Sequence, residues 1–139
     1  MKNLQLESDR LLIRPFRLGD EQEVYDFSSD KVVNRYTGDV LRTSLEEAKK
    51  IITDVWLPDY ANYGYGRFAI IYKPDTKIIG FNGFKYHPNG NFTDFGYRFL
   101  SSYWGKGIAT ESSKMILQYG YKNLPVDEVL GFVMKENPA

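Results

Sequence analysis

The run FGYRFLSSYWGKGIATESS, residues 95–113, constrains the fold more than any other part of this sequence. It begins as a β-strand, turns at Gly105-Lys106-Gly107 and continues as the first turns of an α-helix. A second apolar run, DEVLGFVM at residues 127–134, follows that helix and is typical of a strand. A strand, a helix and a strand in this order predict a right-handed parallel crossover within one sheet.

From the N-terminus up to and including the strand that opens this unit, the sequence predicts a strand, two helices and three consecutive strands. The first strand, LQLESDRLLIRPF, is broken by Pro15, and a short helix begins at Asp20. Ser44 and Glu47 have the spacing of a capping box and open the second helix, which is followed by a loop, LPDYANYGYG. Three strand-like runs come next: RFAIIYK, KIIGFNGFKYH and FTDFGYRFL.

This order of elements predicts one domain over residues 1–139, of the α/β (α+β) class. Three consecutive strands favour an antiparallel meander, so we expect a mixed, mostly antiparallel, twisted sheet with helices on both faces. Neighbouring strands can splay where the meander gives way to the parallel crossover, and the gap between them can hold a ligand. The ligand crevice is therefore expected beside the glycine turn.

The composition argues against several classes of function. The chain has no cysteine and one histidine, so neither disulfides nor a metal site with soft ligands is expected. Eighteen basic and eighteen acidic side chains cancel, which argues against a nucleic-acid partner. No apolar run approaches the roughly 20 residues that span a membrane, and no signal peptide is recognisable. We expect a cytoplasmic protein without a membrane partner.

The glycine turn can bind an anion. A helix leaves its first N–H groups without partners, and its dipole adds partial positive charge there. Gly105 and Gly107 have no Cβ to keep a phosphate away, while Lys106 adds a cation and Thr110 a hydroxyl. A pyrophosphate suits such a site, although glycines before a helix often serve only the turn. The Walker A pattern does not fit because Lys106 is followed by glycine, and the dinucleotide fingerprint does not fit because Thr110 fills its third small position.

The sequence also resembles a known family. FGYRFLSSYWGKGIATES resembles the acetyl-CoA motif of the GNAT acetyltransferase superfamily, in the branch of the RimJ/RimL type, which acetylates ribosomal proteins at an N-terminal alanine. The opening ESDRLLIRPFRLGDEQEVYDFSSDKVVNRYTGD, the helix SLEEAKKII and the terminal VMKENPA resemble the same branch, in the same order. The resemblance implies an acetyl-CoA-dependent N-acetyltransferase that acts on a primary amine of a protein N-terminus or a small molecule, without a metal.

The resemblance assigns the cofactor contacts. The superfamily loop, Gln/Arg-x-x-Gly-x-Gly/Ala, falls on residues 102–107, with serine at its first position. Backbone amides from the loop and the first helical turn are implied to hold the pyrophosphate of coenzyme A: Gly105, Lys106, Gly107, Ile108, Ala109 and Thr110. The strand ending in Phe99 and Leu100 is implied to pair with the pantetheine arm, and Asn137 to contact the cofactor.

The sequence leaves open which group accepts the proton of the amine. Asp94 lies on the strand implied to border the cofactor, but strand alternation can turn it away from Tyr97, and a solvated strand-end carboxylate is the stronger interpretation. Glu111 is expected to complete the first helical turn, where acidic charge is favourable. His87 is expected in a surface turn, and a chain of water molecules is a further route for the proton.

The sequence also offers candidate contacts to the amine that receives the acetyl group. Arg35 and Tyr36 match a family segment that borders the acceptor, although an exposed pair at a helix end is an equal interpretation. Tyr97 is a candidate substrate contact, whereas Trp104 is expected to anchor the loop by packing.

Two rival functions stay open, and so does one departure of the sequence from the family pattern. The first rival is a non-catalytic acetyl-CoA-binding domain of the same fold, and the second is a nucleotide-binding regulatory module. Family members continue after the asparagine-containing ENPA run with a helix and further strands, whereas the sequence stops at Ala139. Either the sequence is incomplete at this end, or the protein lacks that wall of the fold, in which case the strand at 127–134 has an open edge that invites a homodimer or aggregation.

Overall fold

The computed structural model describes residues 4–30, 44–123 and 131–134. The described strands form one sheet in the order β1-β2-β3-β4-β5-β6, in which β5 and β6 are parallel and all other neighbours antiparallel. The predicted meander and parallel crossover are confirmed. The strands are β1 (Leu6–Glu7), β2 (Leu11–Pro15), β3 (Arg67–Tyr72), β4 (Lys77–His87), β5 (Phe92–Phe99) and β6 (Gly131–Met134).

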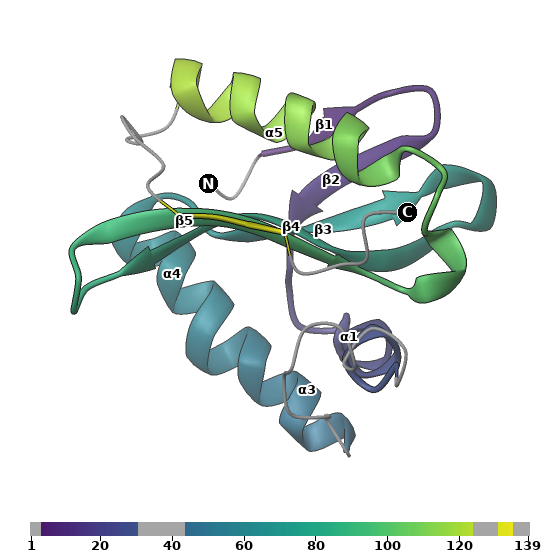
Figure 1. Ribbon diagram of the computed structural model, residues 1–139. Helices are drawn as coiled ribbons and strands as arrows, with labels where there is room; N and C mark the ends of the chain where they lie inside the picture. The colour runs from purple at the N-terminus through teal and green to yellow at the C-terminus, as the bar shows by residue number, and fades with distance from the viewer. Residues whose placement is uncertain (1–3, 31–43, 124–130, 135–139) are drawn as a thin grey trace.

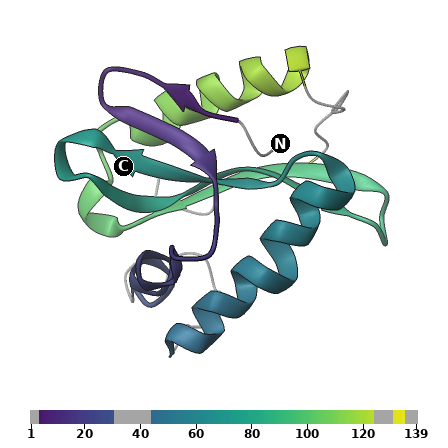
Figure 2. The same ribbon diagram turned by 180° about the vertical axis from the view of Figure 1, so that it is seen from behind.

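Helices cover both faces of the sheet. Helix α5 (Ile108–Asn123) crosses one face, while α1 (Glu21–Ser28), α3 (Leu45–Ile51) and α4 (Leu57–Tyr63) lie against the other (Figures 1 and 2). The fold is therefore the mixed α/β arrangement that the order of elements predicts. Three short turns complete it: the π-helical η1 (Ile52–Trp56) and the 3₁₀ turns η2 (Lys73–Asp75) and η3 (Ser101–Tyr103).

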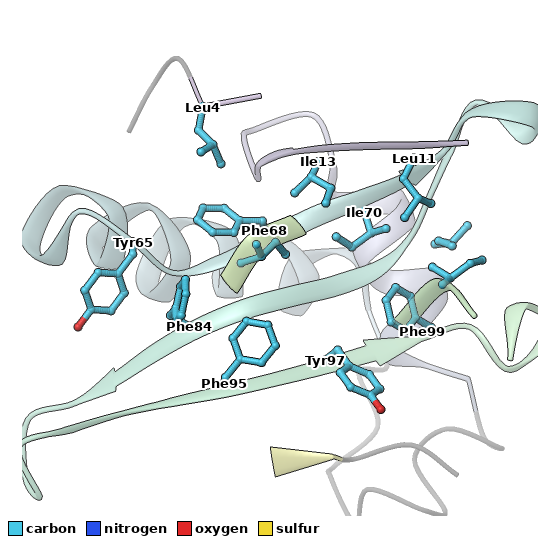
Figure 3. Packing of buried hydrophobic residues seen from close by; sticks show 13 residues of the cluster. Leu4, Leu11, Ile13, Tyr65, Phe68, Ile70, Phe84, Phe95, Tyr97 and Phe99 are labelled. Atoms are coloured by element: carbon cyan, nitrogen blue, oxygen red, sulfur yellow. The ribbon is translucent and has the colours of Figure 1, made fainter. Parts of the chain in front are cut away.

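Two apolar cores flank the sheet, because side chains alternate between its faces. On the α5 side, Ile108 and Ile116 pack over aromatic residues of β4 and β5, including Phe84 and Phe95 (Figure 3). On the other side, Val24 and Phe27 of α1 pack with residues of α3, η1 and the sheet. The sheet thus separates a helix that follows the glycine turn from helices that come earlier in the chain.

The sequence-based boundaries are wrong in two places. The first run is two strands, because Ser8 turns the chain between them: its N–H donates to the Leu11 oxygen, and its Oγ accepts from the Leu11 N–H. The run after Trp56 is helix α4, not a loop. In η1 the Leu57 N–H reaches back to the Ile52 oxygen, and this wider π-turn accommodates Pro58, which has no N–H and would clash in a regular helix interior.

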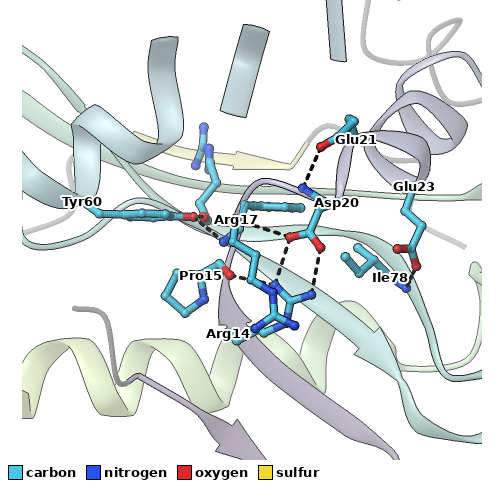
Figure 4. Close-up of polar contacts among 11 residues, drawn as sticks. Arg14, Pro15, Arg17, Asp20, Glu21, Glu23, Tyr60 and Ile78 are labelled. Atoms are coloured by element: carbon cyan, nitrogen blue, oxygen red, sulfur yellow. Dashed lines mark hydrogen bonds and ion pairs between the residues drawn. The ribbon is translucent and has the colours of Figure 1, made fainter. Parts of the chain in front are cut away.

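A partly buried ion pair fixes the junction of β2 and α1. The Asp20 carboxylate receives two hydrogen bonds from the Arg14 guanidinium, at 2.9 and 3.0 Å, and one from the Arg17 N–H (Figure 4). Glu23 of α1 accepts from the Ile78 N–H of β4 at 2.7 Å. Because both ends of these contacts are regular elements, α1 is held at a defined place under the sheet.

Helix α5 docks closely on β4. The Asn82 amide donates to the hydroxyls of Ser112 and Ser113, at 2.8 and 3.0 Å. One turn before the helix ends, Gly120 faces the Phe84 ring, and a Cβ on Gly120 would stand only 2.5 Å from Phe84 Cζ. This docking sets where the N-terminus of α5 lies.

We expect Gly120→Ala to destabilise the protein by about 1–3 kcal/mol, because Phe84 is fully buried and cannot move aside. An alanine in an ordinary helix interior would instead add about 1 kcal/mol of stability. Urea unfolding followed by circular dichroism measures the difference. Gln118→Ala, at an exposed position of the same helix, is the matched control and should change stability by less than about 0.5 kcal/mol. A Gly120→Ala protein more stable than the wild type would contradict this packing.

Candidate functional site

The glycine turn forms the N-terminus of α5. Gly105 and Gly107 have φ angles of +77° and +76°, a region that favours glycine. The Gly107 oxygen accepts the first helical hydrogen bond, from the Glu111 N–H at 3.0 Å. The amides of residues 108–110 therefore have no partner within the helix. No part of the described chain lies within 4 Å of where a Cβ on Gly105 would stand, so an anion has room beside the turn.

Two aromatic residues anchor the turn. The Trp104 indole N–H donates to the Phe99 oxygen at 3.0 Å, in agreement with its expected anchoring role. The Tyr103 hydroxyl donates to the Asp75 carboxylate, and this hydrogen bond, with a smaller contribution from burial, raises the pKa of Tyr103 to about 12. The turn is thereby tied to β5 on one side and to η2 on the other.

A carboxylate at the end of α1 holds the start of the same segment. Asp30 accepts from both the N–H and the Oγ of Ser101, each at 3.0 Å. Ser101 begins η3, which leads directly into the glycine turn. A contact between residues 71 positions apart thus links the α1 side of the sheet to the cofactor loop predicted from the sequence.

A third clamp comes from the turn between β1 and β2. Arg10 Nε donates to Glu111 Oε1 at 2.8 Å, Arg10 Nη2 to the Lys106 oxygen at 2.7 Å, and the Ser8 hydroxyl to Glu111 Oε2 at 2.5 Å. Burial raises the pKa of Glu111, but the hydrogen bonds from Ser8 and Arg10 and the charge of Arg10 together lower it below its ordinary value. Glu111 lies in the first turn of α5, as expected; its partners, about 100 positions away, were missed because nothing local marks them.

On the side away from β4, no described strand pairs with the backbone at the end of β5. The Leu100 N–H donates to the Ile79 oxygen at 2.9 Å, so the alternation of an antiparallel pair turns the N–H and C=O of Phe99 away from β4. The described pairing of β5 with β6 ends at Tyr97 and Met134. The Phe99 backbone therefore lies beyond that pairing, with its oxygen already bonded to Trp104. An extended group can add to the Phe99 N–H as a further strand would.

The splay of β5 from β6 is not observed directly, because the residues after Met134 lie outside the described part of the chain. Asn137, Arg35 and Tyr36 also lie outside it, and their predicted contacts stay predictions. Leu100 uses its N–H on Ile79, and its oxygen accepts from the Tyr103 N–H at 2.9 Å. The backbone N–H and oxygen of Leu100 are therefore both bonded within the protein, which weakens the prediction that Leu100 pairs with the pantetheine arm.

Asp94 is not a solvated carboxylate, and that interpretation is corrected. It is 7% exposed; its Oδ1 lies 3.0 Å from Arg67 Nη2, and its Oδ2 lies 2.6 Å from His87 Nε2. His87 is the last residue of β4 rather than a surface turn residue, and its ring stacks on Phe92. Burial lowers the pKa of Arg67, and the charge of Asp94 opposes that effect. Asp94 and its partners Arg67 and His87 lie on the sheet face opposite α5.

This face carries further charge around an aromatic ring. The guanidinium carbons of Arg67 and Arg98 lie 5.5 and 5.8 Å from the centre of the Phe81 ring. Lys85 Nζ lies 2.9 Å from an oxygen of the buried Asp59 of α4. The face is therefore polar where β4 and β5 meet, beside an apolar core.

Tyr97 lies on the other face from Asp94. The residue is 7% exposed, and the centre of its ring lies 5.6 Å from that of Phe99, within the core on the α5 side (Figure 3). The alternation along β5 thus separates the two sequence candidates for substrate and proton contacts. A role of the Tyr97 side chain with the acceptor stays a prediction.

The described residues contain neither a cluster of metal ligands nor a membrane-spanning helix. No three His, Cys, Asp or Glu side chains among them gather closely enough to hold a metal ion. None of the helices in the described ranges is both long and apolar enough to cross a bilayer.

The clamp on Glu111 predicts a pH dependence. Since the pKa of Glu111 is lowered on folding, its contribution to stability is present above its ordinary pKa of 4.5 and is lost as the pH falls through the folded value. Wild type should therefore exceed Glu111→Gln in stability at pH 7, and the difference should shrink between about pH 5 and pH 3. Urea midpoints of the two proteins across this range measure it; a difference that is constant with pH would contradict the ion pair.

Comparison with known proteins agrees with this geometry. A family model described as an acetyltransferase (GNAT) domain matches residues 10–139. An uncharacterized N-acetyltransferase of Bacillus licheniformis, p20, is 31% identical over 137 residues, covering 95% of this chain and 74% of the relative.

Solved acetyltransferases share the fold. A GNAT acetyltransferase from Bacillus anthracis superposes with a TM-score of 0.70 at 24% identity, covering 88% of this chain and 69% of that one. The ribosomal-protein-S5-alanine acetyltransferase from Vibrio fischeri gives 0.67 at 19% identity, covering 86% and 68%. The microcin C7 self-immunity acetyltransferase MccE, in complex with acetyl-CoA and AMP, gives 0.66 at 20% identity, covering 84% and 66%. The chain belongs to the GNAT family of acetyltransferases.

Proposed function

We propose that this acetyltransferase binds acetyl-CoA at residues 99–110 and transfers the acetyl group to a primary amine. One observation carries the proposal: the N-terminus of α5, with two glycines at positive φ, follows directly on the strand end where the Phe99 N–H faces away from β4. A site for a dianion and an edge for an extended amide chain therefore lie on one continuous segment. Coenzyme A has both parts, since its pyrophosphate is followed by the extended amide chain of the pantetheine arm.

The described residues fit the two parts. The amides of the first turn of α5 and the positive end of its dipole would hold the pyrophosphate. The open space beside Gly105 allows the phosphates to come close to the backbone. The Phe99 N–H would donate a hydrogen bond to the pantetheine arm, which would lie along β5 as an added strand, while the Trp104 indole N–H occupies the Phe99 oxygen.

Bound acetyl-CoA supplies an acetyl group that is already activated as a thioester. What the protein must add is placement, which can supply a large part of the rate when the amine is held at the thioester in neutral form. A group that accepts the proton of the ammonium is also needed.

Asp94 is the proposed proton acceptor, assisted by His87. The two side chains are 2.6 Å apart, and the partly exposed His87 side chain provides a path for the proton to water. Arg67 holds the other carboxylate oxygen and fixes its orientation. The amine is proposed to approach in neutral form from the side opposite α5, where Asp94 and His87 lie.

The proposed acceptor class is a protein N-terminus or a small-molecule amine, in the manner of the RimJ/RimL-type enzymes. The likeness to the ribosomal-protein-S5-alanine acetyltransferase supports the first of these. Arg35 and Tyr36, in the segment that resembles the acceptor border of that branch, are the proposed contacts to the amine substrate, and Asn137 a contact to the cofactor.

Calorimetric titration with acetyl-CoA tests the proposal, with ATP and Mg²⁺ as the control ligand. We expect dissociation constants in the micromolar range for acetyl-CoA and no heat for ATP with Mg²⁺. Release of free coenzyme A thiol is then measured with peptides that begin with alanine or serine and with a set of small amines. Binding without turnover on any amine would favour a non-catalytic binding domain, and preferred binding of ATP would favour a nucleotide-binding module.

Asp94→Asn should lower kcat by about 10²–10⁴-fold with the best amine, because an amide cannot accept the proton. Its affinity for acetyl-CoA should stay within about twofold, which also shows that the variant is folded. Asp54→Asn, at an exposed position of η1, is the matched control and should retain full activity. An Asp94→Asn enzyme with wild-type kcat would remove Asp94 from the mechanism.

A further inference from the structure

Arg10 makes contacts on two sides of the glycine turn. Its Nη2 donates to the oxygen of Lys106, between the two glycines, and its Nε pairs with Glu111 in the first turn of α5. A Cβ on Gly107 would stand 3.5 Å from Arg10 Nη2, so the guanidinium lies directly against the turn. The family resemblance assigned no cofactor or substrate contact to Arg10.

The first contact orients a peptide group. The oxygen of Lys106 and the N–H of Gly107 belong to one planar trans peptide and point in opposite directions. By holding the oxygen on its own side, Arg10 turns the Gly107 N–H to the opposite side. That peptide could otherwise rotate, since glycine residues on both sides of Lys106 tolerate many conformations.

The second contact neutralises a charge. Glu111 places a carboxylate in the helical turn whose N–H groups would hold a dianionic pyrophosphate. Left unpaired, this carboxylate would repel that ligand. Arg10 and Ser8 bond both of its oxygens and draw it toward the turn between β1 and β2.

We propose that Arg10 is a positioning residue for the pyrophosphate of coenzyme A, acting through the Lys106 peptide and the charge of Glu111. The inference rests on the proposed function. It extends the site to Ser8 and Arg10, in a turn at the opposite end of the chain. Arg10 itself need not touch the ligand.

Calorimetry of acetyl-CoA with four proteins tests it: the wild type, Arg10→Gln, Glu111→Gln and the double variant. Arg10→Gln should weaken binding by tenfold or more, since it frees the peptide and leaves the carboxylate unpaired. Glu111→Gln should stay within about threefold, because the repulsive charge is removed while Arg10 still holds the Lys106 oxygen. The double variant should bind more tightly than Arg10→Gln alone, and this rescue would not occur if Arg10 served only to stabilise the fold.

Controls separate positioning from folding. Arg17 is an exposed cation that is distant in the sequence from the glycine turn. Arg17→Gln removes this charge, and the variant should bind acetyl-CoA as the wild type does. Thermal unfolding checks that each variant is folded. If Arg10→Gln does not fold, Arg10→Lys keeps the charge but lacks the planar fork that reaches both partners, and it should still weaken binding at least threefold.

The outcomes distinguish the two proposals. A folded wild type that binds no acetyl-CoA would overturn the proposed function, and this inference with it. Wild-type binding with unchanged affinity in Arg10→Gln, or in Arg10→Lys where that variant is needed, would overturn this inference alone. A double variant that binds more weakly than Arg10→Gln would also overturn it.

Discussion

The parallel pairing of β5 with β6 is the constraint on which the candidate site depends. Two parallel neighbours cannot be joined by a tight turn, so the chain must cross a face of the sheet between them, and here it crosses as α5. A helix that returns along the sheet begins where the preceding strand ends. The N–H groups at the start of α5 therefore lie next to the end of β5, whatever the side chains are. Close packing against Phe84 and the hydrogen bonds of Asn82 fix the helix in that place.

Strand alternation along β5 gives its two faces different tasks. Phe95, Tyr97 and Phe99 point into the core beneath α5 and stabilise the crossover. Asp94 and Arg98 belong to the opposite face, where charged groups gather beside Phe81. Burying such charges is unfavourable unless they are paired, and Asp94 is held by both Arg67 and His87. The same strand can thus support a cofactor along its edge and polar chemistry on one face.

The segment between β5 and α5 is fixed by groups that are distant in the sequence. Asp30 holds its start through Ser101, Asp75 holds its middle through Tyr103, and Arg10 holds its end. A turn with two glycines at positive φ would otherwise sample many conformations, and ordering it on binding would reduce affinity. These contacts order it before a ligand arrives. The rest of the domain therefore orders the loop at which the ligand is proposed to bind.

Apart from α4 and the break between β1 and β2, local patterns in the sequence determined the order of the elements, the capping of α3 by Ser44 and the glycine turn at the start of α5, because each depends on neighbours within a few residues. The family could be inferred as well, from motifs that run along the chain. Helix α4 could not be predicted, because its continuation past Pro58 depends on the π-turn before it. Only the tertiary structure decided that Asp94 is buried against Arg67 and His87, and that Arg10 reaches Glu111. These partners come from other strands or from the far end of the chain, and the packing of the sheet, rather than any local signal, brings them within hydrogen-bond distance.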